Sequence, residues 1–560
     1  MSIGRIGVLE DPQTAPAGSL GKPSVAVDVR GLEVRGGRRV LVEGVSLQVG
    51  AGEVLAIAGA SGAGKSTLLE AMAGLRSPSS GSVDFAASGG RDARDGVAVG
   101  FVPQDDIIHR DLPLRASLRF AARLRLPGTC STEEIDRVVE FTLEQLELGT
   151  SGDVRVGSLS GGQRKRASIA TELLAHPDVI FLDEPTSGLD PATAAEVIRV
   201  LRRLAERGTT VVFTTHGLAD LERADRIAFV ANGGRLAFHG TVDEARHYVE
   251  SRDLAALYDL KDGVAPSSGN APDPEREDGA AMAGAGAPPR PRASGAVRQW
   301  GVLTRRTWAL LSSNRLTMAI MFGSPALVVA MMVVLFPAGA AVDPADHPTT
   351  AVQTVFWVAF AGFFFGLTAG LLQIVPEAAI ARRERLAGVR PAVYVASKVT
   401  ALAPVLVAVT IGMLAVLHVM NRLPTTAGSS PVGLGAVVLL ETLSALALGL
   451  LASALVRDAA QATLALPMLC FPQVLFAGAV IGVVDMAPAG WLVSHGMATR
   501  WGFEGIARTL DLGSVMPFDG ELAAFEPAMT GTMSGTTSVL IGITVALLVG
   551  TVAVVERRTR

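Results

Sequence analysis

The sequence predicts an α/β domain followed by an all-α domain of six membrane-spanning helices. Short β-branched runs alternate with helical stretches from residue 24 to about residue 260, which is typical of an α/β fold. Charge is concentrated in the first half: 77 charged residues lie among the first 315, and only 25 among the 245 from Leu316 onward. That second half contains six apolar stretches, each long enough to cross roughly 30 Å of hydrocarbon.

Composition excludes several other classes of protein. A chain of 560 residues with 49% apolar residues is too long for one ordinary domain. A net charge of −4 gives no basic excess for neutralising phosphates, so we expect no nucleic-acid partner. Cys130 and Cys470 lie far apart in regions of different polarity, which argues against a disulfide. The first 23 residues lack the apolar core of a signal peptide.

Composition also sets the predicted domain boundaries. We expect the α/β domain over residues 24–261, a flexible linker rich in Pro, Gly and Ala over 262–296, and a transmembrane domain over 297–560. The six predicted spans are 316–336, 351–376, 399–420, 431–456, 459–484 and 531–555.

The distribution of arginine predicts the orientation in the membrane. Arginines crowd the loop after the second span and follow the last span, as the positive-inside rule expects of cytoplasmic segments. An even number of spans then places both termini in the cytoplasm, in a multi-pass protein of the cytoplasmic membrane. Residues Gln299–Asn314 are amphipathic and are expected along the inner interface, and Asp485–Thr530 are expected mostly outside, with apolar pieces that dip back. The alternative, buried helices of a soluble protein, does not account for six apolar stretches with this charge asymmetry.

The strongest motif is a phosphate-binding loop of the form G-x-x-x-x-G-K-[ST], placed between a predicted strand and a predicted helix. Its glycines let backbone N–H groups turn toward a phosphate, and the helix that follows presents its positive end. Lys65 is expected to reach the β- and γ-phosphates, and the Ser66 hydroxyl to coordinate Mg²⁺. The alternative is a glycine-rich turn with an exposed lysine. The residues expected to bind nucleotide here are Gly59, Ser61, Gly62, Ala63, Gly64, Lys65, Ser66 and Thr67.

An acidic pair follows the apolar strand Val179–Leu182. Asp183 stands at the tip of this strand, where a magnesium ion beside a phosphate loop needs a carboxylate. Glu184 is then placed to orient or deprotonate the attacking water. Without Asp183, a solvated acid at the start of a helix would explain Glu184 as well.

A second anion site is predicted between these two motifs. Ser160, Gly161 and Gly162 offer a hydroxyl and backbone amides at the start of a helix. A chain with one phosphate loop has no internal use for a second such site, whereas a second copy of the chain would supply one. The alternative is a plain helix cap.

Taken in order, these motifs resemble those of ATP-binding cassette transporters, and the resemblance covers nearly the whole chain. It implies a P-loop NTPase cassette with a helical subdomain, with ATP and Mg²⁺ as its ligands. It also makes Gln104, in Phe101–Asp106, a residue that senses the metal and the membrane domain. His216 becomes a γ-phosphate sensor, and Asp190 a contact across a dimer.

A cassette that precedes six spans resembles the G subfamily, the White and pleiotropic-drug-resistance type of half-exporter. Three segments closely resemble sequence motifs of this subfamily: Ala116–Leu126, Ser160–Arg166 and Arg382–Arg385. The paired cysteines of animal members are absent, which indicates a bacterial relative. Arg35 stands where the family carries an aromatic residue against adenine, and arginine also stacks on a base. The resemblance implies a dimer, either of two copies or with a related half-transporter.

Residues within the predicted spans leave alternatives open. Phe356, Phe360, Phe363 and Phe364 either line an apolar cavity between two chains or face lipid. Glu441, the one fixed charge inside a predicted span, either binds a cationic substrate or hydrogen-bonds a neighbouring helix.

The opposite charges of two other segments suggest a contact. Asp105 and Asp106 follow Gln104, and arginines 382, 383 and 385 lie in the loop after the second span. We hypothesise that they meet where the cassette joins the membrane domain, and two solvated charge clusters are the alternative.

The function that follows is ATP-driven export of a hydrophobic or amphipathic substrate (a lipid, drug or secondary metabolite) across the cytoplasmic membrane by a dimer in the lipid bilayer. Two alternatives remain: export of a glycan or lipid-linked polymer, and a membrane-anchored ATPase that regulates a partner protein.

Overall fold

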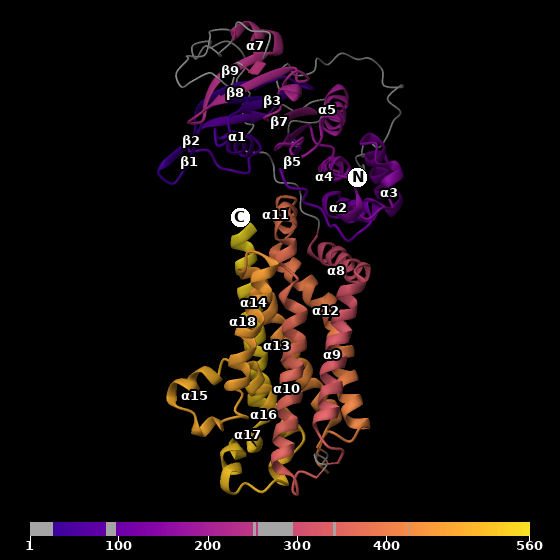
Figure 1. The fold of residues 1–560 in the computed structure, drawn as a ribbon, viewed down its shortest axis with the longest axis vertical. Helices are drawn as coiled ribbons and strands as arrows, with labels where there is room; N and C mark the ends of the chain where they lie inside the picture. Colours follow the sequence, from indigo (N-terminus) through magenta and orange to yellow (C-terminus); the bar gives the residue numbers. More distant parts are fainter. Residues whose placement is uncertain are drawn as a thin grey trace, which may run out of the picture. The chain divides into compact units, whose positions relative to one another are not determined.

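A computed structural model describes residues 26–85, 97–249, 254–255, 295–339, 343–424 and 426–559. The chain divides into two compact units (Figure 1). Unit 1 contains residues 1–108 and 132–291, and unit 2 contains residues 109–131 and 292–560. The predicted linker lies outside the described residues apart from Gly295 and Ala296.

Unit 1 is built on two sheets, which confirms the predicted α/β class. A three-stranded antiparallel sheet has the order β2-β1-β4, and a six-stranded sheet has the order β5-β6-β7-β3-β8-β9, in which β9 is antiparallel to β8. The strands are β1 (Val27–Gly36), β2 (Arg39–Val49), β3 (Val54–Gly59), β4 (Ser80–Phe85), β5 (Val99–Val102), β6 (Val179–Leu182), β7 (Thr210–Thr214), β8 (Arg226–Ala231) and β9 (Arg235–Thr241).

The central strands of the larger sheet position the predicted site. β3, β6 and β7 are apolar runs buried on both faces, as expected for parallel strands that are covered by helices. Because they run in parallel, their carboxyl ends lie at one edge, where polar residues follow each strand. The helices of unit 1 are α1 (Lys65–Met72), α3 (Thr132–Gln145), α4 (Gly161–Leu173), α5 (Pro191–Glu206), α6 (Leu218–Leu221) and α7 (Val242–Tyr248).

Unit 2 is all-helical, as predicted. Five helical segments are long and apolar enough to cross a membrane among the residues that the structure describes: 317–335, 348–386, 391–419, 431–455 and 533–559. The second comprises α10 and α11, joined by a short 3₁₀ turn. The helices of unit 2 are α2 (Leu114–Arg125), α8 (Ala296–Ser313), α9 (Arg315–Leu335), α10 (Pro348–Leu371), α11 (Ala378–Leu386), α12 (Pro391–Val419), α13 (Pro431–Leu455), α14 (Ala459–Leu475), α15 (Pro488–Ser494), α16 (Ala498–Thr509), α17 (Glu526–Thr530) and α18 (Met533–Thr559).

The predicted fifth span, 459–484, differs most from the structure. Its helix, α14, has 17 residues and ends at Leu475. Pro467 and Pro472 lie inside it, and each removes a backbone N–H that a continuing helix would use. Gly478, with φ of 83°, then turns the chain away from the helical direction.

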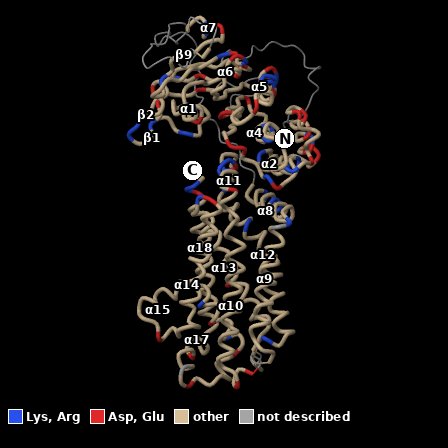
Figure 2. The backbone as a smooth tube through the Cα atoms, viewed as in Figure 1, with Lys and Arg blue, Asp and Glu red and all other residues tan. Residues whose placement is uncertain are grey.

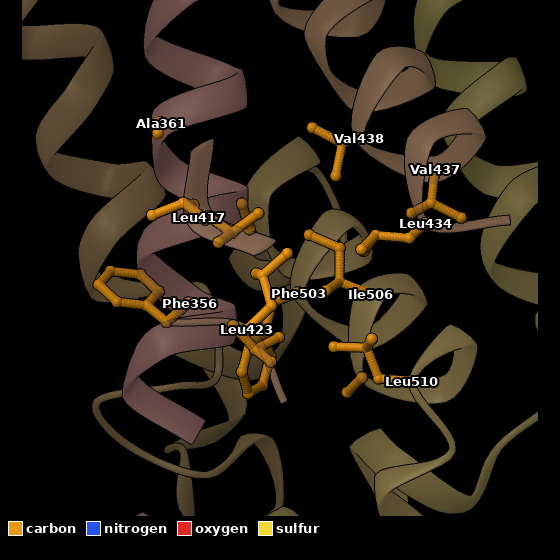
Figure 3. Packing of buried hydrophobic residues seen from close by; sticks show 14 of the residues in the cluster. Phe356, Ala361, Leu417, Leu423, Leu434, Val437, Val438, Phe503, Ile506 and Leu510 are labelled. Atoms are coloured by element: carbon orange, nitrogen blue, oxygen red, sulfur yellow. The ribbon is translucent and has the colours of Figure 1, made fainter. Parts of the chain in front are cut away.

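Close helix packing defines the centre of unit 2. Gly366 of α10 lies so near α13 that a Cβ placed on it would be 2.0 Å from the carbonyl oxygen of Thr442. Gly362 and Gly370, one turn to either side, also face α13 closely. Toward one end of the bundle, an apolar cluster joins α10, α12, α13 and α16 (Figure 3). The labelled members of this cluster are Phe356, Ala361, Leu417, Leu423, Leu434, Val437, Val438, Phe503, Ile506 and Leu510.

Two segments of unit 2 lie in surroundings that the sequence did not predict. Helix α16 comes from the stretch 485–530, and it is buried against α10, α13 and α18. Residues 109–131, which the sequence places inside the nucleotide-binding domain, belong to unit 2, where α2 packs against α8. The compact units of the structure therefore do not follow the order of the chain.

Candidate functional site

The phosphate loop connects β3 to α1 at the carboxyl edge of the larger sheet. Gly64 immediately precedes α1 with φ of 99°, and a Cβ at this position would lie 2.4 Å from the carbonyl oxygen of Leu41, so only glycine fits. Lys65 is buried, and its Nζ donates to the carbonyl oxygens of Gly59 and Ala60 at 2.9 Å each. Burial lowers the pKa of Lys65, and the charges of Glu184 and Asp183 oppose that shift. The loop therefore holds a cation beside backbone amides, which suits a polyphosphate.

Oxygen ligands for a magnesium ion converge beside this loop. The Ser66 hydroxyl donates to Asp183 Oδ1 at 3.0 Å, although the two residues are 117 positions apart in the chain. Thr214, the last residue of β7, donates to the same carboxylate oxygen at 2.6 Å. Hard oxygen donors of this kind are what Mg²⁺ prefers. Ser66 and Asp183, two of the three residues that the sequence assigns to the metal, therefore lie together and fit that ion. The third, Gln104, contacts Glu184 through its side-chain amide.

Glu184 lies at the centre of the predicted catalytic group. The Gln104 side-chain amide donates to Glu184 Oε2 at 2.9 Å, and His216 Nε2 pairs with the other carboxylate oxygen. The backbone of Glu184 is left-handed, with φ of 44°, and its N–H donates to the Thr214 hydroxyl at 2.9 Å. A left-handed non-glycine residue costs energy and is found at functional sites more often than elsewhere. Three predicted residues from separate segments thus meet at one carboxylate.

Several residues that support this site are absent from the sequence-based set. Lys165 Nζ donates to the backbone carbonyl of Gln104 at 2.6 Å and fixes that segment. The buried Asp220 carboxylate accepts from the hydroxyls of Thr186 at 2.6 Å and Thr215 at 2.7 Å, which brackets the segment that carries His216. The polar residues at the end of the predicted strand were a usable signal for Thr214 and Thr215, whereas the partners of Lys165 and Asp220 depend on the fold.

A second group of predicted nucleotide-binding residues is formed by Ser160, Gly162 and Asp190. Ser160 caps α4, accepting from the Gln163 backbone N–H at 3.3 Å while the Gln163 side chain accepts from the Ser160 N–H at 3.0 Å. Asp190 caps α5 through the backbone N–H groups of Ala192 and Thr193, and hydrogen bonds to Thr193 lower the pKa of its carboxyl. A Cβ on Gly162 would lie 2.2 Å from the Thr193 side chain, so the starts of α4 and α5 touch.

Arg35 and Asp106 have partners within unit 1. Arg35 is exposed in β1, and its Nε lies 2.5 Å from Glu33 Oε1. Asp106 pairs with Lys165 at 3.4 Å and lies 4.0 Å from Arg164. The hypothesis of a contact between Asp106 and the arginines at 382–385 therefore has a competing partner, Lys165, that the sequence did not suggest.

Unit 2 contains a buried charged cluster at the end of the bundle that carries α8 and α11. Arg306 of α8 forms a two-pronged ion pair with Glu384 of α11, and Lys398 Nζ lies 2.8 Å from Glu377 Oε2. His109, which precedes α2, is buried with its Nε2 unpaired among the described residues. Burial, reinforced by the charge of Arg306, lowers the pKa of His109 to about 3. The histidine is therefore neutral.

The four phenylalanines of α10 that the sequence groups together differ in how deeply they are buried. Phe356 and Phe363 of α10 are buried in the bundle, whereas Trp357 is exposed and Phe360 and Phe364 are half-buried. Glu441 of α13 is fully buried and faces Gly502 of α16. Neither carboxylate oxygen of Glu441 has a hydrogen-bond partner in the part of the chain that the structure describes. The alternative that Glu441 hydrogen-bonds a neighbouring helix is therefore wrong for this structure.

Comparison with known proteins identifies both halves of the chain. Residues 42–187 match the family model of the ABC transporters, and residues 298–510 match that of the ABC-2 type transporters. The chain is 32% identical to an ABC transporter ATP-binding/permease protein of Mycobacterium tuberculosis, an alignment that covers 87% of this chain and 58% of the relative.

Shorter alignments link the chain to the G family. The broad substrate specificity ATP-binding cassette transporter ABCG2 of Sus scrofa is 39% identical over 35% of this chain and 31% of its own length. ABC transporter G family member 22 of Arabidopsis thaliana is 39% identical over 39% of this chain and 30% of its own length. The chain therefore spans less than two thirds of the length of each of these relatives.

Proposed function

The chain belongs to the ABC transporter family, with the domain order of the G subfamily, and on that premise we propose that it hydrolyses ATP to drive export across the cytoplasmic membrane. The observation that carries the proposal is the convergence of Gln104, Asp183, Glu184 and His216 beside the phosphate loop. An ABC ATPase domain binds ATP with Mg²⁺, and the residues of this loop fit both.

The proposed chemistry assigns one task to each residue. Lys65 and the loop amides hold the β- and γ-phosphates, and Ser66 and Asp183 would hold Mg²⁺, which supplies charge neutralisation when bound. Glu184 accepts a proton from water as the water oxygen bonds to the γ-phosphorus and the bond to the ADP oxygen breaks. Gln104 and His216 keep the Glu184 carboxylate oriented, since each contacts one of its oxygens.

We further propose that the working unit is a dimer. One chain carries one phosphate loop and one group formed by Ser160, Gly162 and Asp190, so two facing chains would complete two ATP sites. ATP that bridges two cassettes shifts their equilibrium toward the closed state only because ATP binds the closed state more tightly than the open state. A homodimer and a pair with a related half-transporter both satisfy this requirement.

A hydrophobic or amphipathic substrate suits the apolar character of α10. Trp357, Phe360 and Phe364 form a run of ring contacts with centroids 5.8 to 6.4 Å apart, on the less buried side of that helix. The faces of aromatic rings are large apolar surfaces, which can pack against an apolar substrate. The name of the porcine relative describes broad substrate specificity and no chemical class, so the apolar class proposed for this chain rests on α10 alone.

The test combines ATP turnover with transport. We expect ATPase activity of the purified full chain to rise with members of a panel of lipids and amphipathic drugs, and inside-out vesicles to accumulate the same compounds when ATP is present. Glu184→Gln should abolish both. ATP turnover that responds only to an added protein, with no vesicle accumulation, would instead support a regulatory ATPase.

A further inference from the structure

Helix α8 presents two faces with different chemistry. Its buried face packs against α12 and includes Gln299, Leu303 and Arg306. Other residues of α8 are exposed, and this exposure continues to the first residue of α9. We call five of these exposed residues the α8 stripe: Val297, Trp300, Arg305, Trp308 and Arg315. The exposed fractions of its three large apolar residues are 79% for Val297, 41% for Trp300 and 38% for Trp308.

Two neighbouring helices fix the depth of the stripe relative to a bilayer. The Trp300 indole N–H donates to the Thr400 hydroxyl of α12 at 3.1 Å. From Thr400 to the end of α12 at Val419 is about 30 Å at 1.5 Å per residue, which equals the hydrocarbon thickness. Helix α9 runs from Arg315 to Leu335 and also spans about 30 Å. Trp300 and Arg315 therefore both lie at the boundary between hydrocarbon and headgroups.

The chemistry of the stripe fits the headgroups at that level. Tryptophan is enriched at membrane interfaces because its ring is apolar and its N–H is polar. Arginine binds phosphate through a planar fork of N–H donors. Residues 295–315 contain four arginines and no Asp or Glu, so the helix is complementary to anionic lipid. Figure 2 shows charged residues of unit 2 at both ends of the bundle, including Lys and Arg at the end that carries α8 and α11, with few in between.

We propose that the α8 stripe binds the phosphate headgroups of anionic phospholipids in the adjoining leaflet, and that the bound lipid tunes ATP turnover. The buried face of α8 offers a physical route. The Gln299 amide donates to the Gly388 carbonyl at 3.0 Å and accepts from the Arg390 N–H at 3.2 Å, both in the connection from α11 to α12. Arg306 is paired with Glu384 of α11. A lipid that holds α8 in place therefore also holds α11.

Lipid binding is tested first, because it does not depend on the proposed function. Full-length protein in mild detergent is incubated with equimolar phosphatidylglycerol and phosphatidylcholine, and the bound lipids are counted by native mass spectrometry. Each arginine near an anionic surface contributes about fivefold in affinity, so Arg305→Gln/Arg315→Gln should reduce bound phosphatidylglycerol about 25-fold. The matched variant Arg390→Gln/Arg457→Gln removes two exposed arginines outside the stripe and should retain the bound phosphatidylglycerol. Equal loss in both variants, or in neither, would overturn the site.

Regulation is tested separately, and this arm rests on the proposed ATPase. In nanodiscs, raising phosphatidylglycerol from zero to half of the lipid should change ATP turnover of the unmodified chain severalfold, and the Arg305→Gln/Arg315→Gln variant should lose that response. A response of equal size in this variant would overturn the regulatory role. A chain that binds phosphatidylglycerol through the stripe but hydrolyses no ATP would keep the lipid site and refute the proposed function instead.

Discussion

The side-chain amide of Gln104 donates to Glu184 Oε2 across 2.9 Å, although 80 residues separate them in the chain. Gln104 follows β5 and Glu184 follows β6, and these two strands are parallel neighbours with Val102 opposite Leu182. The register of two strands therefore places an amide on the carboxylate proposed to activate water. His216, after β7, reaches the same carboxylate from the next strand of the sheet.

We expect Glu184→Gln to lower ATP turnover by about 100-fold or more, because removal of a general base typically costs that factor. Nucleotide binding, measured by fluorescence of an ATP analogue, should be unchanged, since the amide keeps the shape of the side chain. Glu206→Gln, an exposed substitution at the end of α5, should leave turnover unaltered. Turnover within twofold of the unmodified chain would remove Glu184 from its assigned role.

Thr214 is expected to be a positioning residue. Its hydroxyl donates to Asp183 and accepts from the Glu184 N–H, so Thr214→Val leaves both groups without that partner. An unsatisfied buried group costs about 1–3 kcal/mol, and we expect the Mg²⁺ concentration for half-maximal turnover to rise about tenfold. Thr214→Ser restores the hydroxyl and should restore the Mg²⁺ dependence. A valine variant with an unshifted Mg²⁺ profile would contradict this role.

Glycine at 366 is predicted to be required for packing of α10 on α13. In Gly366→Ala, the new methyl group would lie 2.0 Å from the Thr442 carbonyl oxygen, and overpacking of this kind costs about 1–3 kcal/mol. Gly412→Ala on α12 meets nothing within 4 Å and should be neutral or stabilising by up to about 1 kcal/mol. Thermal unfolding of the two purified variants distinguishes these outcomes, and equal midpoints would be inconsistent with the tight contact.

His109 predicts a pH dependence of stability. The pKa of His109 is about 3 in the folded chain, whereas its ordinary value is 6.5. Between these two pH values the unfolded chain therefore binds a proton at this histidine and the folded chain does not. The free energy of unfolding should therefore fall below pH 6.5, by up to about 1.4 kcal/mol per pH unit. Arg306, Glu377, Glu384 and Lys398 are the charged groups that act on it.

The measurement is the unfolding midpoint at pH 7 and at pH 5. His109→Gln removes the titrating ring and should flatten the loss seen in the unmodified chain. His347→Gln, at an exposed position that precedes α10, should not. An unmodified chain whose midpoint is unaffected by the drop in pH would show that His109 does not resist protonation.

Short motifs made the nucleotide site predictable. The phosphate loop and the acidic pair are each defined by neighbouring residues, and apolar strands before them indicated the sheet edge where they meet. Thr214 and Lys165 were not assigned roles, because their partners depend on strand order and on the approach of α4 to residue 104. Their roles are set by contacts that are distant in the chain.

The spans of unit 2 were predictable from the length and apolarity of their sequences, but the points where its helices end were not. Pro467 and Pro472 lie inside α14, and its end at Leu475 was not predicted. The buried helix α16 carries Arg500, Glu504 and Arg508, which read as exposed residues until their mutual ion pairs are seen. Hydropathy averages over such pairs and therefore misses a charged helix inside a bundle.

Residues 109–131 have a consequence for experiments that exchange parts between related transporters. This short segment is encoded within the first half of the chain, but its Leu124 belongs to an apolar cluster with Val302 and Leu311 of α8. A chimera joined near residue 296 would pair this segment of one parent with the helices of the other parent. Grafts that carry residues 109–131 together with everything after 296 keep the packing of α2 on α8 within one parent. These are the exchanges that should yield folded hybrids.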